Sequence, residues 1–209
     1  MLERVHVVDL TRTIDHNLEI YADGAYRDPD FGVETWCTVE SQGYWVSKLS
    51  LGTQTGTHID APAHFKSGGA TLESLPAKYL LGPYFLIDLD RIHDSRQFED
   101  VMEGYSGQLI LLLTPTPGRT SHSVAELTLT QFHRLCALGA KVWAVVGSVH
   151  VQGEDPLYFH VQLAEQGIFL VEDLDQEAAS EVRPGGELIA LPLRLTGVSG
   201  SPCRVLVLQ

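Results

Sequence analysis

Apolar and polar positions alternate along this chain in short blocks, and most apolar blocks have the length of a β-strand. The blocks are rich in branched aliphatic and aromatic residues, which favour extended backbone. The leucine-rich run at residues 109–113 is apolar throughout, as is typical of a strand buried on both faces. The pattern predicts strands at residues 5–10, 35–39, 44–51, 79–89, 109–113, 141–147, 168–171 and 203–208.

Amphipathic stretches between these blocks predict helices. Residues 95–102 predict a short helix, and residues 127–138 predict a second that closes at the glycine which follows. Asp155 followed by Pro156 indicates the N-cap and first position of a third helix, which ends at Gly167. The chain is therefore expected to be mixed α and β, with strands in excess.

Length and charge narrow the possible classes of protein. A chain of 209 residues can bury one sizeable core, so we expect a single domain over residues 1–209. The net charge of −13 argues against nucleic acid or an anionic membrane surface as partner. No apolar run approaches the roughly 18 residues of a membrane helix. Three separated cysteines fit a reducing compartment, and charged Glu3 and Arg4 do not fit a signal peptide, so we expect a cytoplasmic protein.

One short stretch, "GTQTGTHIDAPAH" at residues 52–64, concentrates residue types that bind metal ions. Its β-branched residues favour extended backbone, in which alternate residues share a face. Gln54, His58 and Asp60 are then expected to project to one side. Gly56 lies between them and leaves space for an ion or a substrate. Imidazole nitrogen and carboxylate oxygen suit zinc, manganese or iron.

The same stretch continues through Pro62, which is expected to turn the chain so that His64 approaches the same point. Each of these polar residues, taken alone, is more often a solvated or hydrogen-bonded side chain than a ligand. Several ligand types on one face, spaced by glycine, make a metal site the better interpretation.

Other catalytic motifs are not found. The chain has no Gly-x-Ser-x-Gly elbow, no phosphate-binding loop and no dinucleotide fingerprint. Trp36 and Trp45 are candidates for lining a substrate pocket, although core packing is the favoured interpretation for both.

The stretch "GTQTGTHIDAPAHF" resembles the His-x-Gly-Thr-His-x-Asp-x-Pro-x-His signature of the cyclase-like metal-dependent hydrolases, a family that includes kynurenine formamidase, isatin hydrolase and trans-dienelactone hydrolase. The resemblance extends over most of the chain. It implies a strand-rich α/β domain of the swivelling β/β/α type, with a barrel-like β core and flanking helices. Further blocks in family order are "VVDLTRTI", "SGGATLESLP", "GPYFLIDL", "HVQLAEQGIFLVEDL" and "LPLRLTGVSGSPCRVLVL".

The resemblance also implies roles for individual residues. His58 and Asp60 become metal ligands, with Asp60 placed to bridge two ions where two are bound. His64 becomes the general acid and base. His160 and Glu172 match the family's later histidine and glutamate, which complete the second metal position. Without the resemblance, His160 would be a polar residue on a half-buried helix face and Glu172 an ordinary strand-end carboxylate.

The sequence departs from the family pattern at two places. Gln54 stands where kynurenine formamidases have histidine; the resemblance implies glutamine in the trans-dienelactone hydrolase branch, and the amide oxygen would be a weaker metal ligand. Ser148 stands where relatives carry an aspartate. His150 is a candidate substitute nearby, although an ordinary loop histidine is the favoured interpretation.

These observations predict a metal-dependent hydrolase that cleaves an amide or lactone bond of a small cyclic or aromatic substrate. The expected cofactor is one or two divalent ions, zinc with manganese as the alternative. The resemblance also implies a homodimer or larger homo-oligomer in which a neighbouring subunit helps to close the pocket. The alternative function is a non-catalytic, metal-containing small-molecule binding protein of the same fold. His64 separates the two, because a binding protein has no need of an unligated histidine beside the ion.

Overall fold

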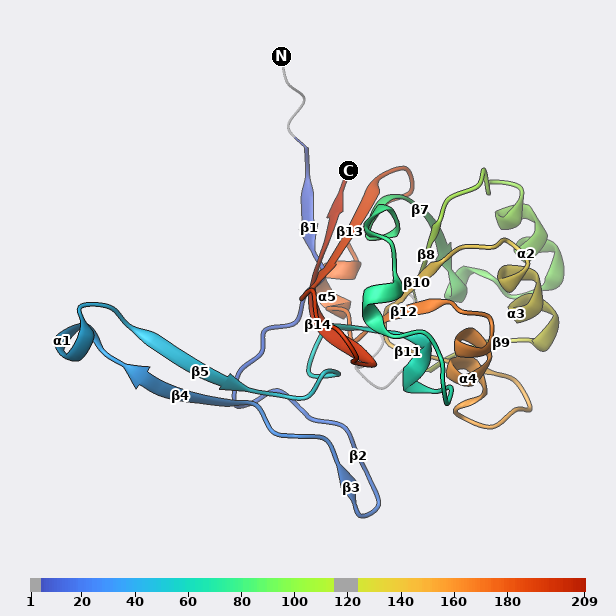
Figure 1. Cartoon of the computed structure of the whole chain (residues 1–209). Helices are drawn as coiled ribbons and strands as arrows, with labels where there is room; N and C mark the ends of the chain where they lie inside the picture. The colour runs from blue at the N-terminus through green and yellow to red at the C-terminus, as the bar shows by residue number, and fades with distance from the viewer. Residues whose placement is uncertain (1–4, 115–123) are drawn as a thin grey trace.

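The main sheet of the protein closes on itself. The computed structural model describes residues 5–114 and 124–209. Eight strands pair in the order β1-β14-β13-β7-β8-β10-β12-β6, and a further pairing of β6 with β14 closes seven of them into a barrel-like ring (Figure 1). The strands of this sheet are β1 (Val7–Asp9), β6 (His58–Asp60), β7 (Leu81–Asp88), β8 (Ile110–Thr114), β10 (Val142–Val145), β12 (Phe169–Glu172), β13 (Glu187–Pro192) and β14 (Gly200–Leu208).

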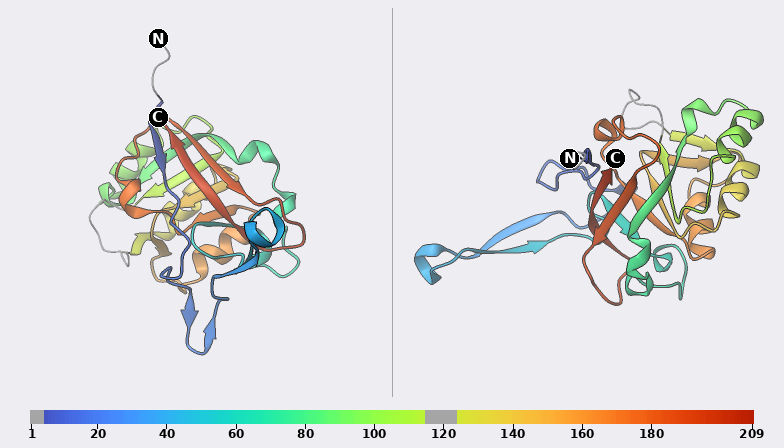
Figure 2. Two further views of the ribbon diagram at one scale, coloured as in Figure 1. Left: turned by 90° about the vertical axis from the view of Figure 1, so that its left-hand side faces the viewer. Right: turned by 90° about the horizontal axis from the view of Figure 1, so that it is seen from above.

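One half of the ring is parallel and the other half is antiparallel. Strands β7, β8, β10 and β12 are parallel neighbours, whereas β6, β13 and β14 pair antiparallel. The parallel strands are joined through α2 (Ser95–Met102), α3 (Leu129–Cys136) and α4 (Tyr158–Glu165), which lie together along one side of the molecule (Figures 1 and 2). Parallel strands need such crossovers, and the crossover helices bury the outer face of the sheet.

The core therefore has two layers. Along β8, Ile110 and Leu112 pack into the cluster inside the ring, whereas Leu111 and Leu113 pack into the cluster under the helices. All four side chains are almost completely buried. Full burial of such a side chain contributes about 1.5–3 kcal/mol, so this run stabilises both layers at once. The uninterrupted leucine run in the sequence is explained by this burial on both faces.

Two hairpins leave the body of the molecule. β4 (Gly32–Cys37) pairs with β5 (Val46–Ser50), and with α1 (Val39–Gln42) at the tip they form a long arm that projects away from the barrel (Figures 1 and 2). Trp36 and Trp45 on this arm are 69% and 70% exposed. The expectation that both pack in the core is wrong, because the arm reaches beyond any core of its own chain.

No helix in residues 5–114 and 124–209 is long and apolar enough to cross a membrane.

Shorter elements complete the described fold. The shorter elements are β2 (Ala22–Asp23), β3 (Tyr26–Arg27), β9 (Val124–Leu127), β11 (Ser148–Val151), α5 (Gln176–Ala179) and the 3₁₀ helices Pro62–His64, Leu72–Ser74, Ala77–Tyr79 and Leu89–Arg91.

The predicted class and most predicted elements are confirmed. The chain forms a mixed α/β domain with a barrel-like β core, and each predicted strand overlaps an observed one. One helix start is wrong. Asp155 does not cap the third helix, which begins at Tyr158; its carboxylate accepts a hydrogen bond from the Leu157 backbone in a turn before the helix (2.8 Å). Strands β2, β3, β9, β11 and β13 were not predicted, because short or alternating segments carry weak signals.

Candidate metal centre

The centre of the site is the short strand β6, which lies between β12 and β14 in the ring. His58 and Asp60 on this strand are only 6% and 4% exposed. The antiparallel register places His58 opposite Glu172, the last residue of β12. His58, Asp60 and Glu172 each offer a ligand atom, and these atoms lie within 4.8 Å of one another. Two distant segments of the chain thus meet at one point that can hold a cation.

The chain before β6 is turned rather than extended. Gly56 has a φ of 64°, in the left-handed region that glycine enters at no steric cost. A Cβ at this position would lie 3.1 Å from Cγ1 of Ile14, so a larger residue would also have to displace that side chain. We expected one extended segment from Gln54 to Asp60 with alternate side chains on one face. That expectation is wrong for the residues before His58, because the extended strand begins only there. Gln54 comes near Asp60 because the chain folds back, not because alternate residues share a strand face.

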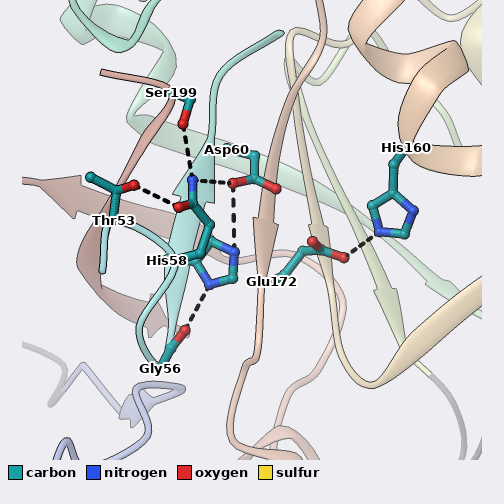
Figure 3. Close-up of polar contacts among 8 residues, drawn as sticks. Thr53, Gly56, His58, Asp60, His160, Glu172 and Ser199 are labelled. Atoms are coloured by element: carbon teal, nitrogen blue, oxygen red, sulfur yellow. Dashed lines mark hydrogen bonds and ion pairs between the residues drawn. The ribbon is translucent and has the colours of Figure 1, made fainter. Parts of the chain in front are cut away.

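The turn also sets the state of the His58 ring. Its Nδ1 lies 2.7 Å from the Gly56 carbonyl oxygen, which can only accept a hydrogen bond, so Nδ1 carries the proton (Figure 3). The Nε2 atom then presents its lone pair, and it lies 3.6 Å from Oδ1 of Asp60. A backbone carbonyl oxygen commonly fixes the tautomer of a metal-binding imidazole in this way.

Gln54 lies beside this pair with its amide nitrogen toward Asp60. The nitrogen donates to Oδ1 of Asp60 at 3.2 Å and to the Ser199 hydroxyl at 3.3 Å, while the amide oxygen accepts from Thr53 at 2.6 Å (Figure 3). The potential ligand atom, the amide oxygen, is thus engaged by Thr53. In this arrangement Gln54 orients the Asp60 carboxylate and offers no oxygen to the centre.

His160 reaches the site from α4. Its Nε2 lies 3.0 Å from Oε1 of Glu172, and its Nδ1 is buried without a hydrogen-bond partner among the described residues (Figure 3). The Phe65 ring packs against it with 5.0 Å between the ring centroids. A buried polar atom without a partner is costly, so His160 Nδ1 is a position where a bound ligand would find an unpaired ring nitrogen.

The electrostatics of the site follow from its burial and its mixture of charges. Burial raises the pKa of the Asp60 carboxyl. Burial acts in the same direction on Glu172, but His160, His58 and His64 together outweigh it and lower the pKa of Glu172. Burial alone would lower the pKa of His58, yet Asp60 and Glu172 raise it above its usual value. Two carboxylates in one buried site favour a bound cation, and the donor set of imidazole nitrogen and carboxylate oxygen fits a divalent ion.

His64 lies at the edge of the site. It ends the 3₁₀ helix Pro62–His64, is exposed, and makes an edge-on contact with Phe65, with 4.5 Å between the ring centroids. It is not one of the three clustered ligand candidates, but it is near enough for its charge to lower the pKa of both Asp60 and Glu172. Phe65 thus contacts both His64 and His160. No role was predicted for Phe65 from the sequence, and its position directly after His64 was the only sign of one.

The second departure from the family pattern lies in a separate sheet. Ser148 and His150 belong to β11, which pairs with β9 and not with the ring; Ser148 is exposed and His150 is half-buried. His150 is therefore in a strand and not in a loop, and it is not among the clustered ligand candidates of the described residues.

Comparison with known proteins gives the family. The model of the Cyclase family, described as "Putative cyclase", matches residues 8–109. Kynurenine formamidase of Bacillus cereus is 30% identical over 211 residues, which covers 96% of each chain. Kynurenine formamidase of Bacillus cytotoxicus is 31% identical over 217 residues, with the same coverage. The chain belongs to the cyclase-like metal-dependent hydrolase family.

Solved structures show the same fold for this cyclase-family chain. Isatin hydrolase A from Labrenzia aggregata superposes with a TM-score of 0.76 at 20% identity, over 98% of this chain and 93% of that one. A structure titled as a predicted metal-dependent hydrolase from Bacillus stearothermophilus gives a TM-score of 0.68 at 24% identity, over 98% of both chains. At this level of identity the likeness concerns the fold alone.

Proposed function

We propose that this cyclase-family protein is a metal-dependent hydrolase that cleaves an amide or lactone bond of a small cyclic or aromatic substrate. The observation that carries the proposal is the convergence of His58, Asp60 and Glu172 in one buried site, with the His58 tautomer set to present Nε2. The kynurenine formamidase relatives support an amide bond as the target.

The residues that would hold the ion are His58, Asp60, His160 and Glu172, with Asp60 shared between two ions where two are bound. Zinc is the proposed ion and manganese the alternative, since both accept nitrogen and oxygen ligands. A divalent cation in such a site would lower the pKa of a water far enough to form hydroxide near neutral pH, and would polarise a carbonyl oxygen. We assign Gln54 to the support of Asp60 in place of direct ligation, because its amide nitrogen faces that carboxylate.

His64 is the proposed proton carrier. Its exposed imidazole stands at the edge of the buried cluster, where substrate and water can reach it. It takes the proton from the attacking water as the new C–O bond forms at the carbonyl. It then delivers that proton to the leaving nitrogen or oxygen as the C–N or C–O bond breaks. General acid–base catalysis of this kind is worth roughly 10²–10⁴-fold in rate.

We further propose a homodimer or larger homo-oligomer assembled through the β4–β5 arm. An isolated two-stranded hairpin is marginally stable in water, and large apolar side chains on this arm are exposed. These include Trp36, Val39, Tyr44, Trp45 and Leu49. Packing of the arm against a second copy would cover them and would bring arm residues to the neighbouring subunit's surface.

The deciding experiment is metal analysis of protein purified without chelator, followed by a hydrolysis screen of N-formyl aryl amides, cyclic imides and lactones. Stoichiometric zinc or manganese with turnover of one of these classes supports the hydrolase. Full metal loading with no turnover of any class favours the binding protein instead, for which the departures at Gln54 and Ser148 are the motivating observations.

A further inference from the structure

The hydroxyl of Thr57 joins two segments that flank the metal centre. The side chain is 1% exposed. Its Oγ1 donates to the Asp173 carbonyl oxygen at 2.6 Å and accepts from the Arg12 backbone nitrogen at 2.9 Å. The Thr57 carbonyl oxygen accepts in turn from the Cys203 backbone nitrogen at 2.9 Å. One small residue therefore connects the chain before β6 to three other segments.

The bond from Thr57 to Asp173 lies one residue beyond the last backbone pair of β6 and β12. That last pair is His58 and Glu172, so the next antiparallel partners along the two strands would be Thr57 and Asp173. Backbone pairing stops there, because Asp173 turns into the left-handed region with a φ of 55°. The Thr57 side chain supplies the connection that the backbone no longer makes.

The conformation of Asp173 needs this support. Residues other than glycine rarely adopt a positive φ, although aspartate and asparagine do so more readily than most. Strained backbone of this kind persists where the surrounding structure holds it, and it gathers at functional sites. Here the Thr57 hydroxyl holds the carbonyl, and the guanidinium of Arg12 lies 3.5 Å from the Asp173 carboxylate.

We propose that Thr57 is a positioning residue: its hydroxyl holds the turn after Glu172, and so keeps the Glu172 carboxylate within ligand distance of His58 and Asp60. This inference rests on the proposed metal site and adds a determinant of its affinity. Without the hydroxyl, the turn at Asp173 relaxes, and the Glu172 carboxylate loses its fixed place opposite His58. Outer contacts that orient ligands typically change metal affinity by about 10–100-fold.

The test compares Thr57→Val, which keeps the shape and loses the hydroxyl, with Thr57→Ser, which keeps the hydroxyl. Zinc is titrated calorimetrically into metal-free protein, and the free energy of unfolding of the metal-free form is measured in parallel. We expect the zinc Kd of Thr57→Val to rise about 10-fold or more, and Thr57→Ser to restore it to within about 3-fold of the wild type.

Thr128→Val is the matched control. Thr128 caps α3 through a hydrogen bond from the Gln131 backbone, so the same substitution removes a hydroxyl contact in the helical layer. We expect this variant to lose stability and to keep the wild-type zinc Kd. If Thr57→Val loses stability to a similar extent with an unchanged zinc Kd, the residue is merely structural and the proposal is wrong.

A second pair of variants tests the same turn at Asp173, whose side chain is exposed. Asp173→Asn and Asp173→Val both remove the charge, but asparagine accepts a positive φ and valine resists it. We expect the valine variant to bind zinc about 10-fold more weakly than the asparagine variant. Equal zinc affinity of the two contradicts the proposal. If the wild type itself does not bind zinc, the proposed metal site is wrong, and the role of Thr57 is wrong with it. If the wild type binds zinc but the variants bind it equally well, only the role of Thr57 is wrong.

Discussion

His160 and Glu172 meet at 3.0 Å, although one side chain comes from the helix α4 and the other from the end of the strand β12. The left-handed Gly167 between helix and strand reverses the chain so that the two elements run side by side. Glu172 is therefore set between two imidazoles, His160 on its own crossover unit and His58 across the sheet. Both histidines therefore depend on one carboxylate.

Glu172→Gln is expected to weaken zinc binding by about 10-fold or more and to lower hydrolysis in proportion to the metal lost. The amide keeps the size of the side chain but removes the charge that both histidines face. Calorimetric zinc titration of the metal-free variant gives the affinity. Glu165→Gln, at the exposed end of α4, is the control. Unchanged zinc affinity in Glu172→Gln would remove this residue from the metal site.

His64→Ala and His58→Ala are expected to fail in different ways. Removal of the proton carrier should leave metal content nearly unchanged and lower kcat by about 10²-fold or more. Removal of His58 should lose metal and activity together, because its Nε2 is a proposed ligand. Metal analysis and steady-state kinetics on both variants make the comparison. Full activity of His64→Ala on a substrate that the wild type hydrolyses contradicts the proposed mechanism.

Gln54→Ala is expected to retain bound metal but to bind it about 10-fold more weakly. The variant removes the hydrogen bond to Oδ1 of Asp60 and no proposed ligand atom. Its zinc affinity should therefore fall between those of the wild type and His58→Ala. An affinity as low as that of His58→Ala would show that Gln54 is itself a ligand.

Replacement of both Trp36 and Trp45 by serine is expected to shift the protein toward the monomer. Both indoles are exposed on the arm, and burial of such rings dominates the stability of many interfaces. Sedimentation velocity over a dilution series is the measurement. Serine replacements of Tyr21 and Tyr26, exposed on the β2–β3 hairpin, are the control and should leave the oligomer intact. A wild-type protein that is monomeric at high concentration excludes the arm-mediated assembly.

Cys203 is expected to make stability fall at alkaline pH. Burial raises the pKa of its thiol from 9.0 to about 12. The thiol of the unfolded chain therefore loses its proton at a lower pH than the thiol of the folded chain. The buried thiol's contribution to the free energy of unfolding is fully present below pH 9 and is lost as the pH rises toward 12. Over that window the loss approaches about 1.4 kcal/mol per pH unit. The pH slope of the unfolding free energy in wild type should exceed that of Cys203→Ala. Equal slopes would contradict the raised pKa.

Much of the fold was predictable because burial leaves a local pattern. Residues 109–113 read as a strand buried on both faces, and β8 packs into both core layers. Residues 95–102 read as a helix, and α2 has those bounds. Strand β13 was not predicted, since only Leu188 and Ala190 of its residues are deeply buried and the alternation is short. Asp155 resembled an N-cap, but the same side chain can close a turn one step earlier, and local sequence does not distinguish the two.

Sequence alone identified the candidate residues of the metal centre. The residue types of "GTQTGTHIDAPAH" and its likeness to one family singled out His58, Asp60 and His64, and family order pointed to His160 and Glu172. Which of these residues meet depends on the tertiary structure. Glu172 lies opposite His58 because the antiparallel register of β6 and β12 puts it there, and register depends on pairing between distant segments. The orientation of Gln54 depends on its hydrogen bonds with Thr53, Asp60 and Ser199 together. The exposure of Trp36 depends on where its hairpin leaves the barrel. Such relationships arise from long-range packing, which no local pattern encodes.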